Sequence, residues 1–387
     1  MKDYKTENLR NIGLFGHGGS GKTTVAEAML FNTGVLDRFG KVEDGTTVTD
    51  FDPEEIKRKI SINAATAPCE WKENRINVID TPGYFDFVGE VVASLKVIDG
   101  VIIAVDSIGG VEVGAEKAWD LVSEGKKACM FFVNKLDREN ANFSKVIEQL
   151  REVFGNKVVP FTLPIGSEAS FKGIVDIIDL KAKTREGNKT VEGDIPADLK
   201  GEVEEYRNMI IEAAAQTDEG LMEKFFGGEE LTKEEIIKGL RLGVISGDVV
   251  PVLCGAAARN IGIDVLMDTV LNFMPSPADA AAPEAVNVKS KEKIKVSIDV
   301  NAPFSAQVYK TIADPFVGKI SMFKVMSGKM KADMEVFNSN KEKKEKLSNL
   351  FLLRGKKQVA IDKLEAGDIA AVAKLQFTTT GDTLCDA

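Results

Sequence analysis

Near its start, the chain contains the sequence Gly16-His17-Gly18-Gly19-Ser20-Gly21-Lys22-Thr23. It matches G-x-x-x-x-G-K-[ST] at every fixed position, between a strand-like run, Ile12–Phe15, and a run with helical spacing, Thr24–Phe31. Glycines let successive backbone N–H groups surround phosphate oxygens, and a helix N-terminus adds partial positive charge. We therefore predict a phosphate-binding loop in which Lys22 contacts the β and γ phosphates and Thr23 binds Mg²⁺. Thr24 extends the site, and His17 shapes the loop.

Outward from this loop, the first half of the chain alternates apolar runs with helix-like segments. This alternation is typical of an α/β fold, in which helices on both faces cover a mostly parallel sheet. The predicted strands are Ile12–Phe15, Ile76–Ile79, Val101–Val105, Met130–Val133 and Val249–Leu253. Ligands of such sheets bind beyond the carboxyl ends of the strands, so we expect the loops that follow these strands to converge on one site.

The loop after the second predicted strand reads Asp80-Thr81-Pro82-Gly83. An aspartate at this place can hold Mg²⁺, usually through water, and Gly83 can offer its N–H group to a γ-phosphate. The pattern D-x-x-G is weak by itself, because it occurs often by chance. It gains weight from its place after a strand and from the phosphate-binding loop upstream.

Two later loops bear on the choice of base. In Asn134-Lys135-Leu136-Asp137, the carboxylate of Asp137 can accept from N1–H and N2–H₂ of guanine, whereas adenine presents no matching donor pair. Such bidentate base contacts are worth about 1–3 kcal/mol each. The loop Cys254-Gly255-Ala256-Ala257 either completes the base pocket through backbone N–H groups or only begins a helix. Four loops in this order predict GTP and GDP as ligands, with Mg²⁺.

Length and spacing predict more than one folded unit. The 387 residues suggest two or three domains. We predict a nucleotide-binding domain over 1–275, with an inserted α+β subdomain at about 156–247 in which Thr232 and Glu235 form a capping box. A proline-containing linker over 276–293 leads to an antiparallel β-barrel over 294–387, where short strand-like runs alternate with turn signals.

Composition excludes several classes of function. The net charge of −10 argues against electrostatic binding of nucleic acid by the surface as a whole. The single histidine, His17, excludes a metal site built on a histidine pair within one chain. No apolar stretch approaches the ~18 residues that a spanning helix needs, and Met1–Lys5 lacks the apolar core of a secretory signal, so we expect a cytoplasmic protein without membrane contact.

The amino-acid sequences of these loops resemble those of the elongation factor G family of translational GTPases. The resemblance rests on these motifs, which together span nearly the whole chain: Asn32-Thr33-Gly34, Trp71-Lys72, Ile79-Asp80-Thr81-Pro82-Gly83, Gly109-Gly110-Val111-Glu112, Val133-Asn134-Lys135-Leu136-Asp137-Arg138, Pro251-Val252-Leu253-Cys254-Gly255, Ala313-Asp314-Pro315-Phe316-Val317-Gly318-Lys319 and Gly381-Asp382-Thr383-Leu384. It implies a GTP-binding domain, a barrel of the translation-factor domain II type, and GTP hydrolysis on the ribosome by a monomer. Three further domains of the family are not in this sequence, which resembles an N-terminal fragment.

Three positions depart from the family pattern. Ser61, in Arg58-Lys59-Ile60-Ser61-Ile62, stands where the family has threonine and keeps the hydroxyl for Mg²⁺. Tyr84 follows Gly83 where the family has the histidine that positions the attacking water. A phenol is a poor base, with an unperturbed pKa near ~10, but it can still hydrogen-bond a water. Ala256 replaces a serine of the base pocket. Lys22 and Tyr84 are the predicted catalytic residues.

These departures suggest a paralogue of elongation factor G and leave three kinds of function open. The first is a ribosome-associated GTP/GDP switch that serves translocation, recycling or rescue and hydrolyses GTP slowly without the ribosome. The second is a slowly hydrolysing GTP-binding interaction protein, which Tyr84 suggests. The third is a P-loop kinase, against which Asn134, Asp137 and the barrel argue.

Overall fold

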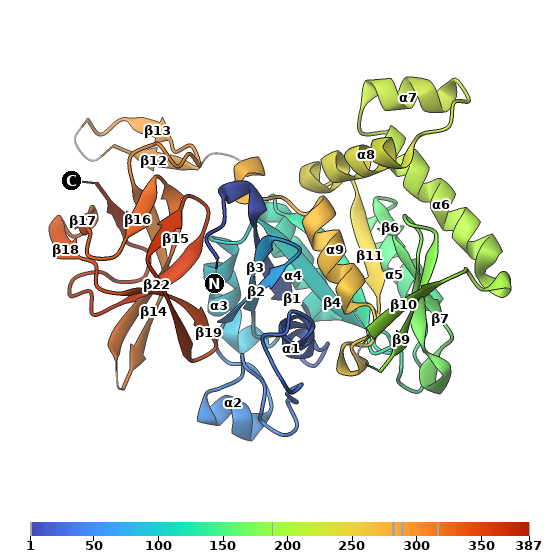
Figure 1. Cartoon of the computed structure of the whole chain (residues 1–387), viewed down its shortest axis with the longest axis horizontal. Helices are drawn as coiled ribbons and strands as arrows, with labels where there is room; N and C mark the ends of the chain where they lie inside the picture. Colours follow the sequence, from blue (N-terminus) through green and yellow to red (C-terminus); the bar gives the residue numbers. More distant parts are fainter. Residues whose placement is uncertain (1, 188, 281–282, 288–289, 316, 387) are drawn as a thin grey trace.

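A computed structural model describes residues 2–187, 189–280, 283–287, 290–315 and 317–386 of the chain. Residues 281, 282, 288 and 289 of the predicted linker lie outside the described residues, as do Met1, Phe316 of a family-like motif, and Ala387 of the predicted barrel. Figure 1 shows a central sheet in blue and teal, a green part on one side of it and an orange to red part on the other.

A mostly parallel sheet forms the centre of the molecule. Within the described ranges it has seven strands in the order β2-β3-β1-β4-β5-β11-β6, and every neighbouring pair is parallel except β2 with β3. The five predicted strands are all in it, as β1 (Leu9–Phe15), β3 (Asn74–Asp80), β4 (Gly100–Asp106), β5 (Ala128–Asn134) and β11 (Val250–Cys254). The two others are β2 (Ala65–Trp71) and β6 (Val158–Pro160). The predicted fold class is confirmed.

The apolar runs predict these strands well because helices bury both faces of the sheet. Val101–Val105 of β4 is almost completely buried, as expected of a central parallel strand. The helices that accompany the sheet are α1 (Lys22–Asn32), α3 (Val88–Leu95), α4 (Val113–Glu124), α5 (Phe143–Phe154) and α9 (Ile263–Phe273). A short helix, α2 (Pro53–Arg58), begins with a complete capping box at Asp52.

The segment between β6 and β11 forms a second, smaller layer. Its strands, among the residues described there, make an antiparallel sheet of four: β7 (Thr162–Ile165), β8 (Gly173–Asp176), β9 (Lys181–Glu186) and β10 (Lys189–Gly193). Helices α6 (Lys200–Ala215), α7 (Glu219–Phe226) and α8 (Lys233–Ser246) follow. The capping box at Thr232 and Glu235 is present. β6 lies inside the predicted inserted segment, yet it pairs with β11 in the central sheet.

The last part of the chain is antiparallel β-structure with a hydrophobic core of its own, centred on Phe323, Val325 and Leu350. Its described strands are β14 (Ser305–Asp314), β15 (Gly318–Ser327), β16 (Lys329–Lys331), β17 (Glu335–Asn338), β18 (Lys343–Lys346), β19 (Leu350–Arg354), β20 (Lys357–Ile361), β21 (Lys363–Glu365), β22 (Ile369–Ala373) and β23 (Thr383–Cys385). β12 (Glu284–Val286), in the region predicted as a linker, pairs with β13 (Lys293–Lys295), which crosses the predicted boundary between the linker and the barrel. We call residues 303–386 the barrel unit.

The barrel unit packs on the edge of the central sheet through buried polar contacts. Arg75 forms an ion pair with Asp368 at 2.6 Å, and Lys324 forms one with Asp99, also at 2.6 Å. All four side chains are buried. Buried charges persist only when they are paired, so these contacts specify how the two parts dock. None of the described helices has both the length and the apolar character needed to span a membrane.

Candidate nucleotide-binding site

The predicted phosphate-binding loop connects β1 to α1 and depends on glycine at several places. Gly16, Gly19 and Gly21 have φ angles of 129°, 86° and 96°, which side chains with a Cβ rarely adopt. At Gly16 a Cβ would also lie 2.4 Å from the carbonyl oxygen of Ala104. Ser20 closes the turn, since its N–H and hydroxyl both donate to the carbonyl of His17. The backbone therefore has the shape expected around a phosphate.

Lys22 is the first residue of α1, and its ammonium group lies within the loop. Its Nζ donates to the carbonyl oxygens of Gly16, at 3.0 Å, and of His17, at 2.8 Å. The side chain is buried, and burial lowers the pKa of Lys22 from 10.5 to about 8 although Asp80 and Asp50 oppose the shift. A phosphate beside this group would restore the pKa and gain a charge-assisted hydrogen bond.

Asp80 ends β3 and is completely buried below the loop. Its Oδ2 accepts a hydrogen bond of 2.7 Å from Thr49, while its Oδ1 has no hydrogen-bond partner among the described residues. Burial raises the pKa of the Asp80 carboxyl. Next to it, the Thr81 hydroxyl donates to the carbonyl of Leu14 at 2.6 Å and ties the end of β3 to β1.

Gly83 and Tyr84 lie directly against the phosphate-binding loop. A Cβ on Gly83 would lie 2.4 Å from Nζ of Lys22 and 2.6 Å from the nitrogen of Gly18, so this position needs glycine. A Cβ on Gly18 would in turn lie 2.9 Å from the ring of Tyr84. Tyr84 is 44% exposed, so its ring covers the loop from the solvent side.

Two hydroxyls and two carboxylates gather beside the loop. Oγ1 of Thr23 and Oγ of Ser61 are 3.1 Å apart. Asp50 is buried nearby, and its Oδ2, like Oδ1 of Asp80, has no hydrogen-bond partner in the described part of the chain. Burial, followed by repulsion from Asp80, raises the pKa of Asp50 to about 7, while a hydrogen bond from Ser61 opposes the shift.

This cluster fits Mg²⁺, which prefers hard oxygen ligands and keeps several waters and phosphate oxygens. The described residues contain no set of three Asp, Glu, His or Cys side chains that would hold a metal alone. A shared site with nucleotide phosphates needs no such set. Sequence reasoning missed Asp50, because a lone acidic residue in the polar run Thr46–Asp50 carries no motif.

The predicted base-recognition loop follows β5. Asn134 braces it, since its Nδ2 donates to the carbonyl of Ser20 at 3.0 Å and its Oδ1 accepts from the N–H of Ala257 at 2.9 Å. Nζ of Lys135 forms an ion pair of 2.6 Å with Asp106. Asp137 lines a cavity that the phosphate-binding loop also lines. One amide therefore connects the phosphate loop to the region predicted to bind the base.

The loop after β11 differs from the expected arrangement, in which its N–H groups face the base. Gly255 N donates to the carbonyl of Val133, Ala256 N to that of Ile261, and Ala257 N to Asn134. These N–H groups are used inside the protein because the loop continues strand pairing and then forms a turn. The turn, Ala257–Arg259, agrees with the alternative interpretation of a helical start, and the neighbouring Ala258 lines the cavity.

Three of the four predicted loops line a cavity of about 1070 Å³ at the carboxyl ends of the strands, and Ala258, one residue beyond the fourth loop, lines it as well. The predicted residues that line it are Gly18, Gly19, Gly21, Lys22, Thr23, Thr24, Ser61, Gly83, Tyr84, Asn134, Lys135 and Asp137. The predicted residues that are not part of this lining are Gly16, His17, Ser20, Asp80, Thr81, Pro82, Gly255, Ala256 and Ala257. The expectation that these loops meet at one site agrees with this geometry.

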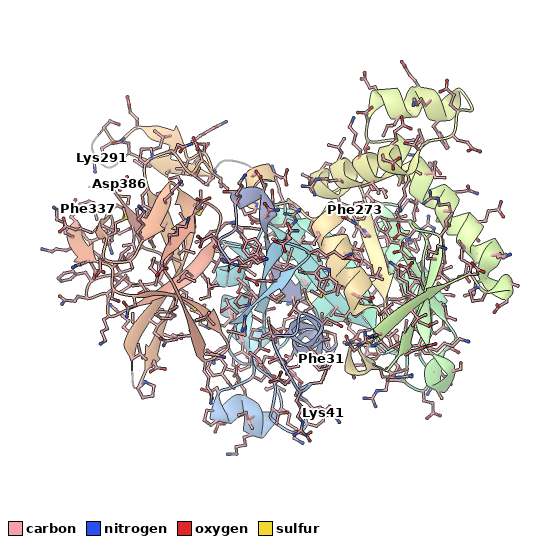
Figure 2. The ribbon with its side chains drawn as sticks, viewed as in Figure 1. Phe31, Lys41, Phe273, Lys291, Phe337 and Asp386 are labelled. Carbon is pink, nitrogen blue, oxygen red and sulfur yellow. The ribbon has the colours of Figure 1, made fainter. Side chains whose placement is uncertain are left out.

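A loop that sequence reasoning did not identify covers one side of the cavity. Residues 39–44 line it, and we call residues 39–48 the lid loop. Glu27 of α1 holds both ends, since Oε1 accepts from Gly40 N and Oε2 from Val48 N, each at 2.9 Å. Phe31, labelled in Figure 2, packs edge-on against Phe39, with ring centroids 5.6 Å apart. Lys41, also labelled, is exposed farther out on this loop.

Comparison with known proteins agrees with this geometry. Residues 7–276 match the family described as Elongation factor Tu GTP binding domain, and residues 303–387 match Elongation factor G domain 2. The chain is also similar to a crystal structure of a protein from Thermus thermophilus, with a TM-score of 0.88 and 31% sequence identity. This similarity covers 98% of the present chain and 54% of the Thermus protein, so the chain spans about half the length of that relative. The order of the two matched domains and the loops around the cavity show that the chain belongs to the elongation factor G family of translational GTPases.

Proposed function

We propose that this chain binds GTP and GDP together with Mg²⁺, hydrolyses GTP, and acts on the ribosome as a nucleotide-dependent switch. The observation that carries the proposal is the convergence of the phosphate loop, the Asp80–Gly83 loop and the Asn134–Asp137 loop on one cavity. A pocket that joins a phosphate cradle to a carboxylate suited to guanine fits a guanine nucleotide better than any other common ligand.

The choice of base rests on Asp137. Guanine carries two N–H donors on one edge, and a carboxylate can accept from both, whereas adenine has no such pair. Asn134 supports this contact indirectly, because it fixes the base loop to Ser20 of the phosphate loop. A site that leaves a buried group unpaired with the wrong base discriminates strongly.

The phosphate end of the pocket supplies charge and positioning. Lys22 contacts the β and γ oxygens, and the backbone N–H groups of the loop surround the same oxygens. Thr23 and Ser61 would offer hydroxyls to Mg²⁺, and Asp80 and Asp50 would hold it through water molecules. When bound, Mg²⁺ supplies neutralisation of the phosphate charge, which is the chief requirement of phosphoryl transfer.

Tyr84 is the proposed water-positioning residue. Its ring lies on Gly18, and its phenol can donate to or accept from a water at the γ-phosphate. It is a weak base, so we propose that hydrolysis is slow until the ribosome fixes the Tyr84 side chain. The same substitution supports a second candidate function, a GTP-binding interaction protein whose turnover stays slow even on ribosomes.

The remaining proposals come from the sequence pattern and from the family. They are a cytoplasmic monomer, a ribosomal partner, and a division into a GTP-binding domain over 1–275 with an insertion at 156–247, a linker over 276–293 and a barrel domain over 294–387. Translocation, recycling and rescue are the candidate steps, and the ribosome is the partner common to all three.

Calorimetric titration of the chain with GTP, GDP and ATP, with and without Mg²⁺, tests nucleotide binding. We expect GTP and GDP to bind and ATP to bind at least about a hundredfold more weakly. Equal affinity for ATP would refute the guanine assignment. Single-turnover GTP hydrolysis by the protein, with and without ribosomes, then separates the two functions: stimulation supports the switch, and unchanged slow turnover supports the interaction protein.

A further inference from the structure

Three segments that are far apart in the sequence meet at one buried lysine of the barrel unit. Lys310 lies on β14 and is 8% exposed. Its Nζ donates to the carbonyl oxygen of Ala64 at 3.0 Å and forms an ion pair with Oε2 of Glu90 on α3. Oε2 of Glu90 also accepts a hydrogen bond of 2.7 Å from the N–H of Ala64. One ammonium and one carboxylate thus hold Ala64 from both sides of its backbone.

The two segments held by Lys310 are the flanks of two loops that line the candidate site. Ala64 begins the approach to β2, three residues after Ser61, which lies against Thr23. Glu90 is in the first turn of α3, shortly after Gly83, which lies against Lys22. A ligand that draws Ser61 and Gly83 toward the phosphate loop therefore pulls on two segments, and Lys310 contacts both of them.

Lys310 is not needed merely to dock the barrel unit. The ion pairs Arg75–Asp368 and Lys324–Asp99 already connect the two parts. Arg75 is at the start of β3, and Asp99 precedes β4, so both pairs lie at the amino ends of strands, whereas the cavity lies at their carboxyl ends. Lys310 differs from them because it contacts the segments that flank two loops of the site.

We propose that Lys310 is a positioning residue that couples the barrel unit to the nucleotide state of the Ser61 and Gly83 loops. This inference rests on the proposed function. In this structure Ser61 and Gly83 face the phosphate loop, and Lys310 and Glu90 hold the segments that flank them. The arrangement therefore favours a nucleotide that carries a γ-phosphate, and by linkage such a nucleotide strengthens the contact with the barrel unit.

The test compares two buried lysines of the barrel unit in the full chain. Lys310→Met removes the ammonium that holds the flanks of the site, and Lys324→Met, the matched control, removes another buried ammonium, which pairs with Asp99 at the amino ends of the strands. The dissociation constants of GDP and of guanosine 5′-(β,γ-imido)triphosphate are measured by calorimetry with Mg²⁺. We expect Lys310→Met to raise the ratio of the analogue's constant to that of GDP by about fivefold or more, and Lys324→Met to leave it within about twofold.

An unchanged ratio in folded Lys310→Met, or the same change in both variants, would overturn the inference. Failure of the wild-type chain to bind either nucleotide would instead refute the proposed function. Adding Glu90→Gln to Lys310→Met should produce little further change in the ratio, because the two side chains act as one unit.

A measurement on the wild-type chain covers the case in which Lys310→Met does not fold. Hydrogen exchange of the Ala64 N–H, which donates to Glu90, is followed with GDP and with the analogue. We expect exchange to be about fivefold or more slower with the analogue, since tighter flanks open less often. Equal exchange rates with the two nucleotides would overturn the proposal.

Discussion

Replacing Lys22 by methionine should separate nucleotide affinity from the stability of the fold. The ammonium makes two hydrogen bonds, to the carbonyls of Gly16 and His17, and is fully buried. Burial lowers its pKa from 10.5 to about 8, which corresponds to a cost of about 3 kcal/mol for keeping the charge in the folded chain. The two hydrogen bonds return about 1 kcal/mol each, so the nucleotide-free variant should be within about 1 kcal/mol of wild type.

The affinity for GTP and GDP should fall much more than the stability does, because Lys22→Met removes a charged hydrogen-bond donor to phosphate. Such contacts are worth about 1.5–3 kcal/mol, so the dissociation constants of GTP and GDP should rise roughly 10- to 150-fold. Lys41→Met is the matched control. Lys41 also lines the cavity but is exposed, and an exposed charge contributes at most about 1 kcal/mol.

The pH dependence of nucleotide affinity follows from the lowered pKa of Lys22. Because the pKa of Lys22 in the free chain is about 8, binding above that pH requires uptake of a proton. Wild-type affinity should therefore fall as pH rises through 8, whereas that of Lys22→Met should not follow this titration. The assay is calorimetric titration at several pH values, with urea unfolding of the nucleotide-free proteins. GTP affinity of Lys22→Met within about twofold of wild type, or equal effects of both variants, would refute the role of Lys22.

Three other changes test separate parts of the molecule. Asp137→Asn should weaken GTP binding about tenfold or more and favour xanthosine triphosphate, whose altered edge suits an amide; unchanged GTP affinity by calorimetry would remove Asp137 from base recognition. On ribosomes, Tyr84→Ala should lower GTP turnover by about tenfold or more and Tyr84→His should preserve or raise it, whereas equal rates in a single-turnover assay would mean that Tyr84 only packs. Arg75→Ala leaves the buried carboxylate of Asp368 unpaired and should lower the free energy of unfolding by about 3–5 kcal/mol; a loss below about 1 kcal/mol in urea titration would show that the ion pair does not hold the interface.

The features of this protein that depend on local chemistry are predictable from its sequence. The phosphate loop is recognisable because Gly16, Gly19 and Gly21 must adopt positive φ angles and Lys22 must begin the helix. The strands are recognisable because a parallel sheet buried on both faces needs continuous apolar runs. Since loops after parallel strands lie at one edge of the sheet, the meeting of Asp80 and Asn134 near the same cavity was also predictable.

The identity of the distant side chains that meet depends on how the whole chain folds. Asp50 becomes a candidate Mg²⁺ residue because the fold buries it beside Asp80, not because of any motif around it. Glu27 on α1 holds the lid loop through two backbone N–H groups, and a helix pattern contains no information about such a partner. Lys310 meets Glu90 across 220 positions of sequence. Contacts of this kind depend on how whole elements pack and on the requirement that buried charges find partners, and neither is encoded in a local pattern.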